Sequence, residues 1–153
     1  MNKHLLLLIA LLGCVCPAYA QAPAVPKIVS DGFNAYKESG ASSAVDAWFT
    51  GSPLAGNPTN KTNYVTFITG QETANGKFLG YEPLGTVTIS PSVKYCYVVF
   101  LYQKDFFYNW FEVYTTGGTD IITSYSSNTT ASAILPASFF VKDKGKTTAK
   151  TAP

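Results

Sequence analysis

The chain has 153 residues, enough for one domain, and its charge is nearly balanced: 11 Lys or Arg against nine Asp or Glu, with a net charge of +2. It contains no Arg, a single His at position 4, and three Cys. This composition disfavours nucleic-acid binding, which relies on basic residues placed among aromatic ones. It also argues against metal sites built from imidazole or thiolate clusters and against His-dependent catalytic triads.

The first 20 residues are typical of a cleaved export signal. Lys3 and His4 precede a short apolar run, and Ala18-Tyr19-Ala20 has the small residues that signal peptidase requires. The run is too short to cross a bilayer core of ~30 Å, which needs ~20 apolar residues. We therefore expect cleavage before Gln21 and export to the periplasm or the extracellular space.

Lipidation is the alternative fate of this N-terminus. Leu11-Leu12-Gly13-Cys14 resembles a bacterial lipobox, in which Cys14 would carry the lipid and become the first residue. Attachment to a membrane is expected only if Cys14 is lipidated, because the acyl chains would be the anchor.

Signal removal changes the thiol inventory of the protein. Cleavage after Ala20 removes His4, Cys14 and Cys16, so that Cys96 is the one thiol of the mature chain. A disulfide framework within one chain is therefore excluded. Because Cys96 stands in an apolar stretch, a buried and inert thiol is favoured over a reactive one.

Two helices are expected after a leader over residues 21–27. The apolar residues of the first have helical spacing: Val29, Phe33 and Tyr36. Ser30 or Asp31 can cap its start, and Gly40 is suited to its end. The buried side of the second helix is predicted to contain Ala44, Val45, Trp48 and Phe49. Ser42 or Ser43 is expected to cap this helix, and Gly51-Ser52-Pro53 is expected to end it.

Residues 57–76 have a mixed pattern. Pro58 suits a first helical turn, and Tyr64, Phe67, Ile68 and Gln71 have helical spacing. The many Thr residues favour a strand instead. We predict a helix.

From Gly80 onward the apolar residues alternate with a period of two, which predicts strands. The predicted strands cover residues 84–90, 93–102, 107–114 and 120–126, with turns at 91–92, 103–105 and 116–118. Residues 134–141 are expected to close the domain by packing Ile134, Leu135 and either Phe139 or Phe140. The predicted fold is α+β, with two or three N-terminal helices packed on a curved antiparallel sheet of about four strands.

We assign residues 28–141 to this single domain and residues 142–153 to a disordered basic tail. Within the domain, the aromatic stretch at 95–114 is predicted to be a hairpin with two different faces, because side chains alternate along a strand. The core face should contain Cys96, Val98, Phe100, Phe111 and Val113. The outward face should contain Tyr95, Tyr97, Val99, Leu101, Tyr108, Trp110 and Tyr114.

This outward face is more apolar than a one-sided antiparallel sheet requires. A homodimer or protein-partner interface would explain it, since Tyr and Trp suit interfaces and large apolar patches mark them. Coverage by the C-terminal segment with Phe139 and Phe140 is a second explanation, and a ligand platform is a third.

The segments SDGFNAYKESGASSAVDAWFTGSPLAG and FLGYEPLG, followed by the aromatic hairpin and Ile134-Leu135-Pro136, resemble small exported bacterial proteins of unknown function. The resemblance covers roughly residues 28–136. The architecture is also similar to the cystatin-like and nuclear-transport-factor-2-like class. That resemblance implies a cone-shaped pocket between helices and sheet, and dimers formed through the other face of the sheet.

Enzymes of this class, such as ketosteroid isomerases, use Asp, Tyr or His in the pocket. The mature chain has no His, and Glu112 is predicted to point away from the core. We therefore expect a non-catalytic exported protein that binds or dimerises through its aromatic sheet face, without cofactor or metal. Two alternatives remain: a module that holds a small apolar ligand between helices and sheet, and an isomerase-like enzyme that uses a carboxylate and Tyr.

Overall fold

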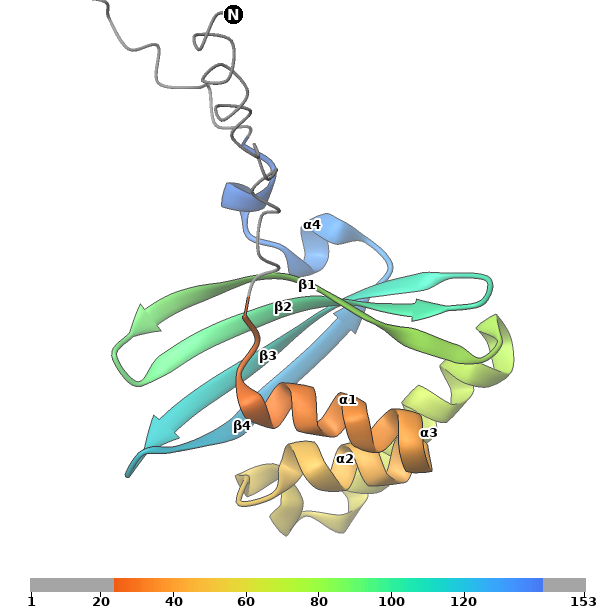
Figure 1. Cartoon of the computed structure of the whole chain (residues 1–153), viewed down its shortest axis with the longest axis horizontal. Coiled ribbons are helices and arrows are strands. Elements are labelled where there is room, and N and C mark those ends of the chain that lie inside the picture. The colour runs from red at the N-terminus through yellow and green to blue at the C-terminus, as the bar shows by residue number, and fades with distance from the viewer. Residues whose placement is uncertain (1–23, 142–153) are drawn as a thin grey trace, which may run out of the picture.

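The structure is a computed structural model that describes residues 24–141. Three helices, α1 (Lys27–Ser39), α2 (Ala41–Phe49) and α3 (Pro58–Asn75), lie against one face of an open four-stranded antiparallel sheet. A short helix, α4 (Ala131–Ile134), lies on the opposite face (Figure 1). The predicted α+β class is confirmed. The predicted signal peptide, the lipidation site at Cys14 and the basic tail fall outside the described residues.

Helix α1 buries the apolar side that its spacing predicts, with Val29, Phe33 and Tyr36 in the core. It ends at Gly40, whose φ of 82° suits a residue without a side chain. The predicted cap at its start is wrong, because Pro26 occupies the cap position. The Ser30 hydroxyl instead donates to the backbone carbonyl of Lys27, a bond that is made from inside the helix.

Helix α2 begins at Ala41, directly after Gly40, so the predicted cap by Ser42 or Ser43 is also wrong. Its buried side is as predicted, with Ala44, Val45, Trp48 and Phe49 in the core. Trp48 lies against α1 and donates from its indole Nε1 to the Val29 carbonyl at 3.0 Å. This bond satisfies the polar atom of a buried aromatic side chain.

The predicted helix over 57–76 is confirmed as α3, which follows a short 3₁₀ helix, η1 (Pro53–Gly56). The Asn57 side chain caps its start by accepting from the Thr59 backbone N–H at 2.9 Å. Thr62 is accommodated because its hydroxyl donates to the carbonyl one turn earlier, at Pro58. Ile68 is the buried residue of α3, so this helix covers the sheet through a narrow contact.

The strands are β1 (Phe78–Ser90), β2 (Val93–Tyr102), β3 (Phe106–Thr116) and β4 (Thr119–Asn128), paired in the order β1-β2-β3-β4. Strand β1 begins earlier than the predicted start at Leu84, because Phe78 and Tyr81 already face the helices. Tyr81 stacks on Phe33 with ring centroids 3.8 Å apart. The register of β1 against β2 shifts at three points, and such bulges bend an edge strand.

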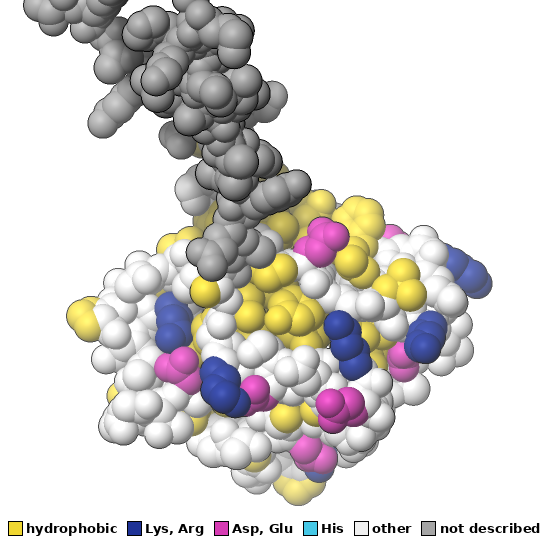
Figure 2. Space-filling model, viewed as in Figure 1, with side chains coloured by type: hydrophobic (Ala, Val, Ile, Leu, Met, Phe, Trp, Pro, Cys, Tyr) yellow, Lys and Arg dark blue, Asp and Glu magenta, His cyan; other side chains and the backbone are white. Residues whose placement is uncertain are grey.

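The core lies between the helices and the sheet. All of the residues predicted for the core face of the hairpin are buried there: Cys96, Val98, Phe100, Phe111 and Val113. Half-buried side chains, among them Val25, Ile28 and Tyr81, extend this core toward the surface. Figure 2 shows apolar side chains gathered between β1 and α1, with charged residues around them.

The C-terminal segment, residues 131–141, comprises α4, the connecting Leu135 and Pro136, η2 (Ala137–Phe139) and the two residues that follow. Its packing agrees with the expectation for Ile134, which is buried, and for Leu135 and Phe139, which are half-buried. Phe140 is 55% exposed, so of the two alternative Phe residues Phe139 is the one that packs.

Candidate binding surfaces

The outer aromatic face is the side of the sheet that points away from α1–α3. Its cross-strand pairs include Tyr97 with Trp110 and Val99 with Tyr108. The continuous register of β2 against β3 places every residue predicted for this surface on the same side: Tyr95, Tyr97, Val99, Leu101, Tyr108, Trp110 and Tyr114. Their role in binding stays a prediction.

The C-terminal segment covers the middle of this face. Tyr97 and Val99 are each only 7% exposed. The Phe139 ring lies against Tyr97, with ring centroids 5.1 Å apart. Gly85 of β1, which pairs with Tyr97, makes room for it, since a Cβ at this position would lie 3.2 Å from the Phe139 ring. The chain therefore shields part of its own aromatic surface.

The remainder of the face, along β3, is open. We call this the β3 patch and define it as Phe106, Tyr108, Trp110 and Tyr114. Phe106 is 45% and Tyr114 is 38% exposed, and the other two members of the patch, Tyr108 and Trp110, are half-buried. Phe140 and Val141 at the end of the C-terminal segment are also exposed.

Phe106 was missed by the sequence reasoning, which began the third strand one residue later. The structure pairs Phe106 with Leu101 and places its ring edge-on to Tyr108, with ring centroids 5.5 Å apart. The sequence contains a signal for this placement: Phe106 stands two residues before Tyr108, and residues two apart in a strand lie on the same side of it.

Glu112 lies on the outer aromatic face, as predicted, and forms a carboxylate–hydroxyl cluster there. One carboxylate oxygen accepts from the Thr123 hydroxyl at 2.6 Å and the other from the Tyr95 hydroxyl at 2.7 Å. The hydrogen bond from Thr123 lowers the pKa of Glu112 the most, and the bond from Tyr95 lowers it further. Burial acts in the opposite direction but is outweighed. A carboxylate with a lowered pKa accepts a proton less readily and is therefore a weaker general base.

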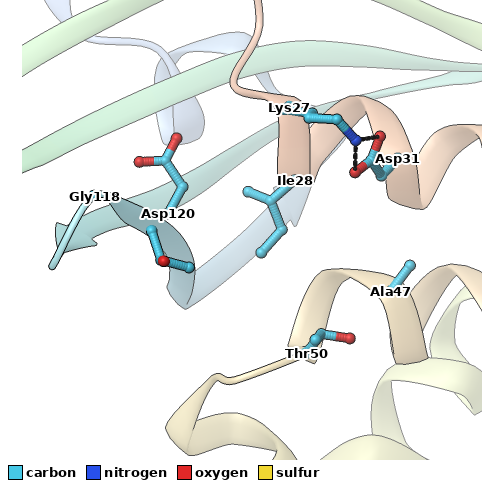
Figure 3. Close-up of a pocket in the computed structure, with 8 residues that line it drawn as sticks. Lys27, Ile28, Asp31, Ala47, Thr50, Gly118 and Asp120 are labelled. Atoms are coloured by element: carbon cyan, nitrogen blue, oxygen red, sulfur yellow. Dashed lines mark hydrogen bonds and ion pairs between the residues drawn. The ribbon is translucent and has the colours of Figure 1, made fainter.

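A shallow groove of about 530 Å³ lies where α1 and α2 meet the β3–β4 turn (Figure 3). Its charged groups are already paired. Lys27 donates to both oxygens of Asp31 at 2.8 and 2.6 Å, and Asp120 accepts from Lys94 at 3.1 Å and from the Thr115 hydroxyl. Burial opposes ionisation of Asp120, but these donors outweigh it and lower its pKa. Within the described residues, each charged side chain that lines the groove therefore already has a partner.

The space between helices and sheet, where the resemblance implies a pocket, is largely filled by aromatic rings. Phe33 contacts Trp48, Phe100 and Phe111 there, with ring centroids 5.0 to 6.1 Å apart. A hollow of about 320 Å³ remains at the edge of this space, between α3 and β4. We call it the α3–β4 hollow.

The Cys96 thiol is fully buried, and desolvation raises its pKa to about 11, as expected for an inert thiol. Within residues 24–141, no cluster of three His, Cys, Asp or Glu side chains is placed to hold a metal ion. In the same range, no helix has both the length and the apolar character needed to cross a membrane.

Comparison of the chain with family models, with curated proteins and with solved structures gives no match. The resemblance to exported bacterial proteins and to the cystatin-like class therefore stays a prediction.

Proposed function

We propose that the protein is an exported, non-catalytic protein that associates with a second copy of itself through the β3 patch. The observation that carries this proposal is the exposure of Phe106 and Tyr114 on a face that the C-terminal segment covers only in part. Phe106 and Tyr114 stand near the two ends of β3, with the half-buried Tyr108 and Trp110 between them on the same face. Association through this face would be favourable, because burial removes apolar area from water.

The chemistry of the patch favours a second copy as the occupant. Its polar groups are Tyr hydroxyls and one indole N–H, and a hydroxyl both donates and accepts hydrogen bonds. Such a surface can pair with itself across a two-fold axis, which brings identical patches together. Glu112 lies beside the patch, between Trp110 and Tyr114 along β3, and its carboxylate is already bound by Tyr95 and Thr123, so bringing two copies of this charge near each other across the axis costs less.

Two features support a role without catalysis and outside the cytoplasm. Hydrogen bonds from Thr123 and Tyr95 lower the pKa of Glu112 and so weaken it as a base, and its side chain lies on the outer face of the sheet rather than between helices and sheet; both facts disfavour the isomerase-like alternative. The residues of the N-terminus have the pattern of an export signal, with Ala18-Tyr19-Ala20 as the cleavage site.

The test is the oligomeric state of the purified protein, measured by size-exclusion chromatography with light scattering over a range of concentrations. We expect a dimer that Phe106→Ser weakens by about tenfold, as loss of a buried aromatic anchor does. Phe106 is exposed, so the variant should keep its fold.

Phe67→Ser is the matched control. Phe67 is 39% exposed, close to the 45% of Phe106, but it lies on α3 in the helical layer, on the other side of the sheet. The control should dimerise like the wild type. A wild type that stays monomeric at every concentration, or equal weakening by the two variants, would overturn the proposal.

A further inference from the structure

The C-terminal segment crosses the outer aromatic face (Figure 1). It follows the end of β4, packs α4 against β3 and β4, and brings Phe139 onto Tyr97 of β2. The exposed rings of the β3 patch, Phe106 and Tyr114, are left near opposite ends of β3. An interrupted surface of this kind offers less continuous apolar area to a second copy.

We infer that residues 137–141 of this segment are an autoinhibitory latch that limits the association proposed above. While Phe139 covers Tyr97, this ring is withheld from a second copy. When the latch lifts, Tyr97 joins the β3 patch, and the association becomes stronger because more apolar area is buried. This role rests on the proposed association through the β3 patch.

Within residues 24–141, the latch is held to the sheet by apolar contact alone. Its backbone hydrogen bonds are local, such as the bond from the Phe139 N–H to the Pro136 carbonyl at 3.0 Å, and none joins it to a strand. Ser138, its one polar side chain, is exposed. Lifting the latch therefore leaves no buried polar group without a partner, a cost that would otherwise hold it closed.

The latch can move without the rest of the C-terminal segment. The anchor of the segment is α4, whose Ile134 is buried, whereas η2 contributes no buried residue. Leu135 and Pro136 between them are extended, with ψ angles of 136° and 156°, so the chain has a non-helical joint there. Lifting the latch uncovers Tyr97 and the half-buried Phe139 and leaves Ile134 in place.

Tyr97 is continuous with the β3 patch once it is uncovered. It is the cross-strand partner of Trp110, a member of that patch. The Tyr95 ring links the two, with its centroid 6.4 Å from that of Tyr97 and 5.2 Å from that of Trp110. The contact with Phe139, at 5.1 Å between centroids, shows that Tyr97 accepts an aromatic side chain. A second copy that reaches the β3 patch therefore lies next to this ring.

The experiment compares two neighbouring variants of the full chain by size-exclusion chromatography with light scattering over a concentration series. Phe139→Ser removes the ring that covers Tyr97, so the dimer dissociation constant should fall by at least about fivefold, as burial of additional aromatic area does. Phe140→Ser is the matched control, because Phe140 belongs to the same latch but is 55% exposed. Its dissociation constant should stay within about twofold of the wild-type value.

Nitration of Tyr97, followed by peptide mass spectrometry on dilute protein, reports the state of the latch independently of association. Tyr97 is 7% exposed beneath the closed latch, so it should react slowly in the wild type and in Phe140→Ser. It should react clearly faster in Phe139→Ser, because the covering ring is gone. Equal nitration of Tyr97 in the wild type and in Phe139→Ser would overturn the inference.

The double variant Phe106→Ser/Phe139→Ser separates the expected association from aggregation of a loosened protein. Phe106 belongs to the β3 patch, so its loss should reverse most of the tightening that Phe139→Ser produces. Tightening that persists in the double variant would contradict the latch. So would equal effects of Phe139→Ser and Phe140→Ser, or a dissociation constant that Phe139→Ser leaves unchanged or raises.

The wild type and Phe139→Ser together distinguish failure of the latch from failure of the proposed function. A wild type that dimerises, with a Phe139→Ser variant that dimerises no more tightly, would refute the latch alone. A wild type that stays monomeric at every concentration, with a Phe139→Ser variant that dimerises through Phe106, would refute the proposed function and keep the latch. Monomers of both chains at every concentration would refute both.

Discussion

At the scale of single residues, polar side chains on the aromatic faces are held by hydrogen bonds to other polar groups. Asn109 is fully buried, where its Oδ1 accepts from Tyr125 and its Nδ2 donates to the Phe107 carbonyl at 2.6 Å. Glu112, its counterpart on the outer face, accepts from Tyr95 and Thr123. Each group is tolerated because its hydrogen-bonding capacity is used.

Glu112 should make the stability of the protein depend on pH. Its pKa is lowered in the folded state, so it stabilises the fold above the unfolded value of ~4.3 and loses this contribution as the pH falls through the folded value. Glu112→Gln removes the titrating group. We expect the urea midpoint of this variant to fall less on acidification than that of the wild type.

Glu82→Gln is the control for this prediction, since Glu82 is an exposed carboxylate on the same face. Its acid dependence should follow that of the wild type. Parallel curves for Glu112→Gln and the wild type would show that the hydrogen bonds of Glu112 do not couple folding to protonation.

At the scale of elements, Gly32 allows Trp48 of α2 to lie directly against the backbone of α1. A Cβ at Gly32 would lie 2.0 Å from the Trp48 Nε1 atom. The Trp48 side chain cannot withdraw, because it is buried and donates to the Val29 carbonyl. The position needs a glycine for space, although its backbone is helical.

Gly32→Ala should therefore destabilise the protein by about 3 kcal/mol, the upper part of the usual cost of overpacking. Gly70→Ala is the matched control, because Gly70 lies within α3 and its Cβ would meet no atom within 4 Å. That substitution should stabilise by about 0.5–1 kcal/mol through helix propensity. Equal effects of the two changes in urea unfolding would contradict the packing argument.

At the scale of the whole molecule, the two faces of the sheet are covered to different extents. The helices α1–α3 cover one face, and the C-terminal segment covers part of the other (Figure 1). Cys96 lies in the fully covered layer and is buried, with a pKa of about 11. Both properties should make its thiol unreactive while the protein is folded.

Thiol titration tests this arrangement together with the expected export signal. The folded protein should not react with an aromatic disulfide reagent at mildly alkaline pH. In denaturant, the exported protein should show one thiol per chain, that of Cys96. Rapid reaction before unfolding would contradict the burial of Cys96, and three thiols would show that Cys14 and Cys16 are retained.

The sequence by itself determined the elements, the α+β class and the core face of the hairpin, because these follow from the period of the apolar residues. Periodicity is a local property, and it assigned Cys96, Val98 and Phe100 to one side of a strand correctly. The caps of α1 and α2 were predicted wrongly, since α1 begins directly after Pro26 and α2 directly after Gly40, which leaves the Ser residues inside the helices.

Only the tertiary structure decided what covers the outer aromatic face and where the hollow lies. Phe139 reaches Tyr97 through a contact between segments far apart in the chain, and the α3–β4 hollow exists because α3 meets the sheet narrowly at Ile68. Both depend on the path of connections and on how large rings fill the space between layers. The alternation of residues along a strand contains no information about either, because it specifies which way a side chain points and not what it meets.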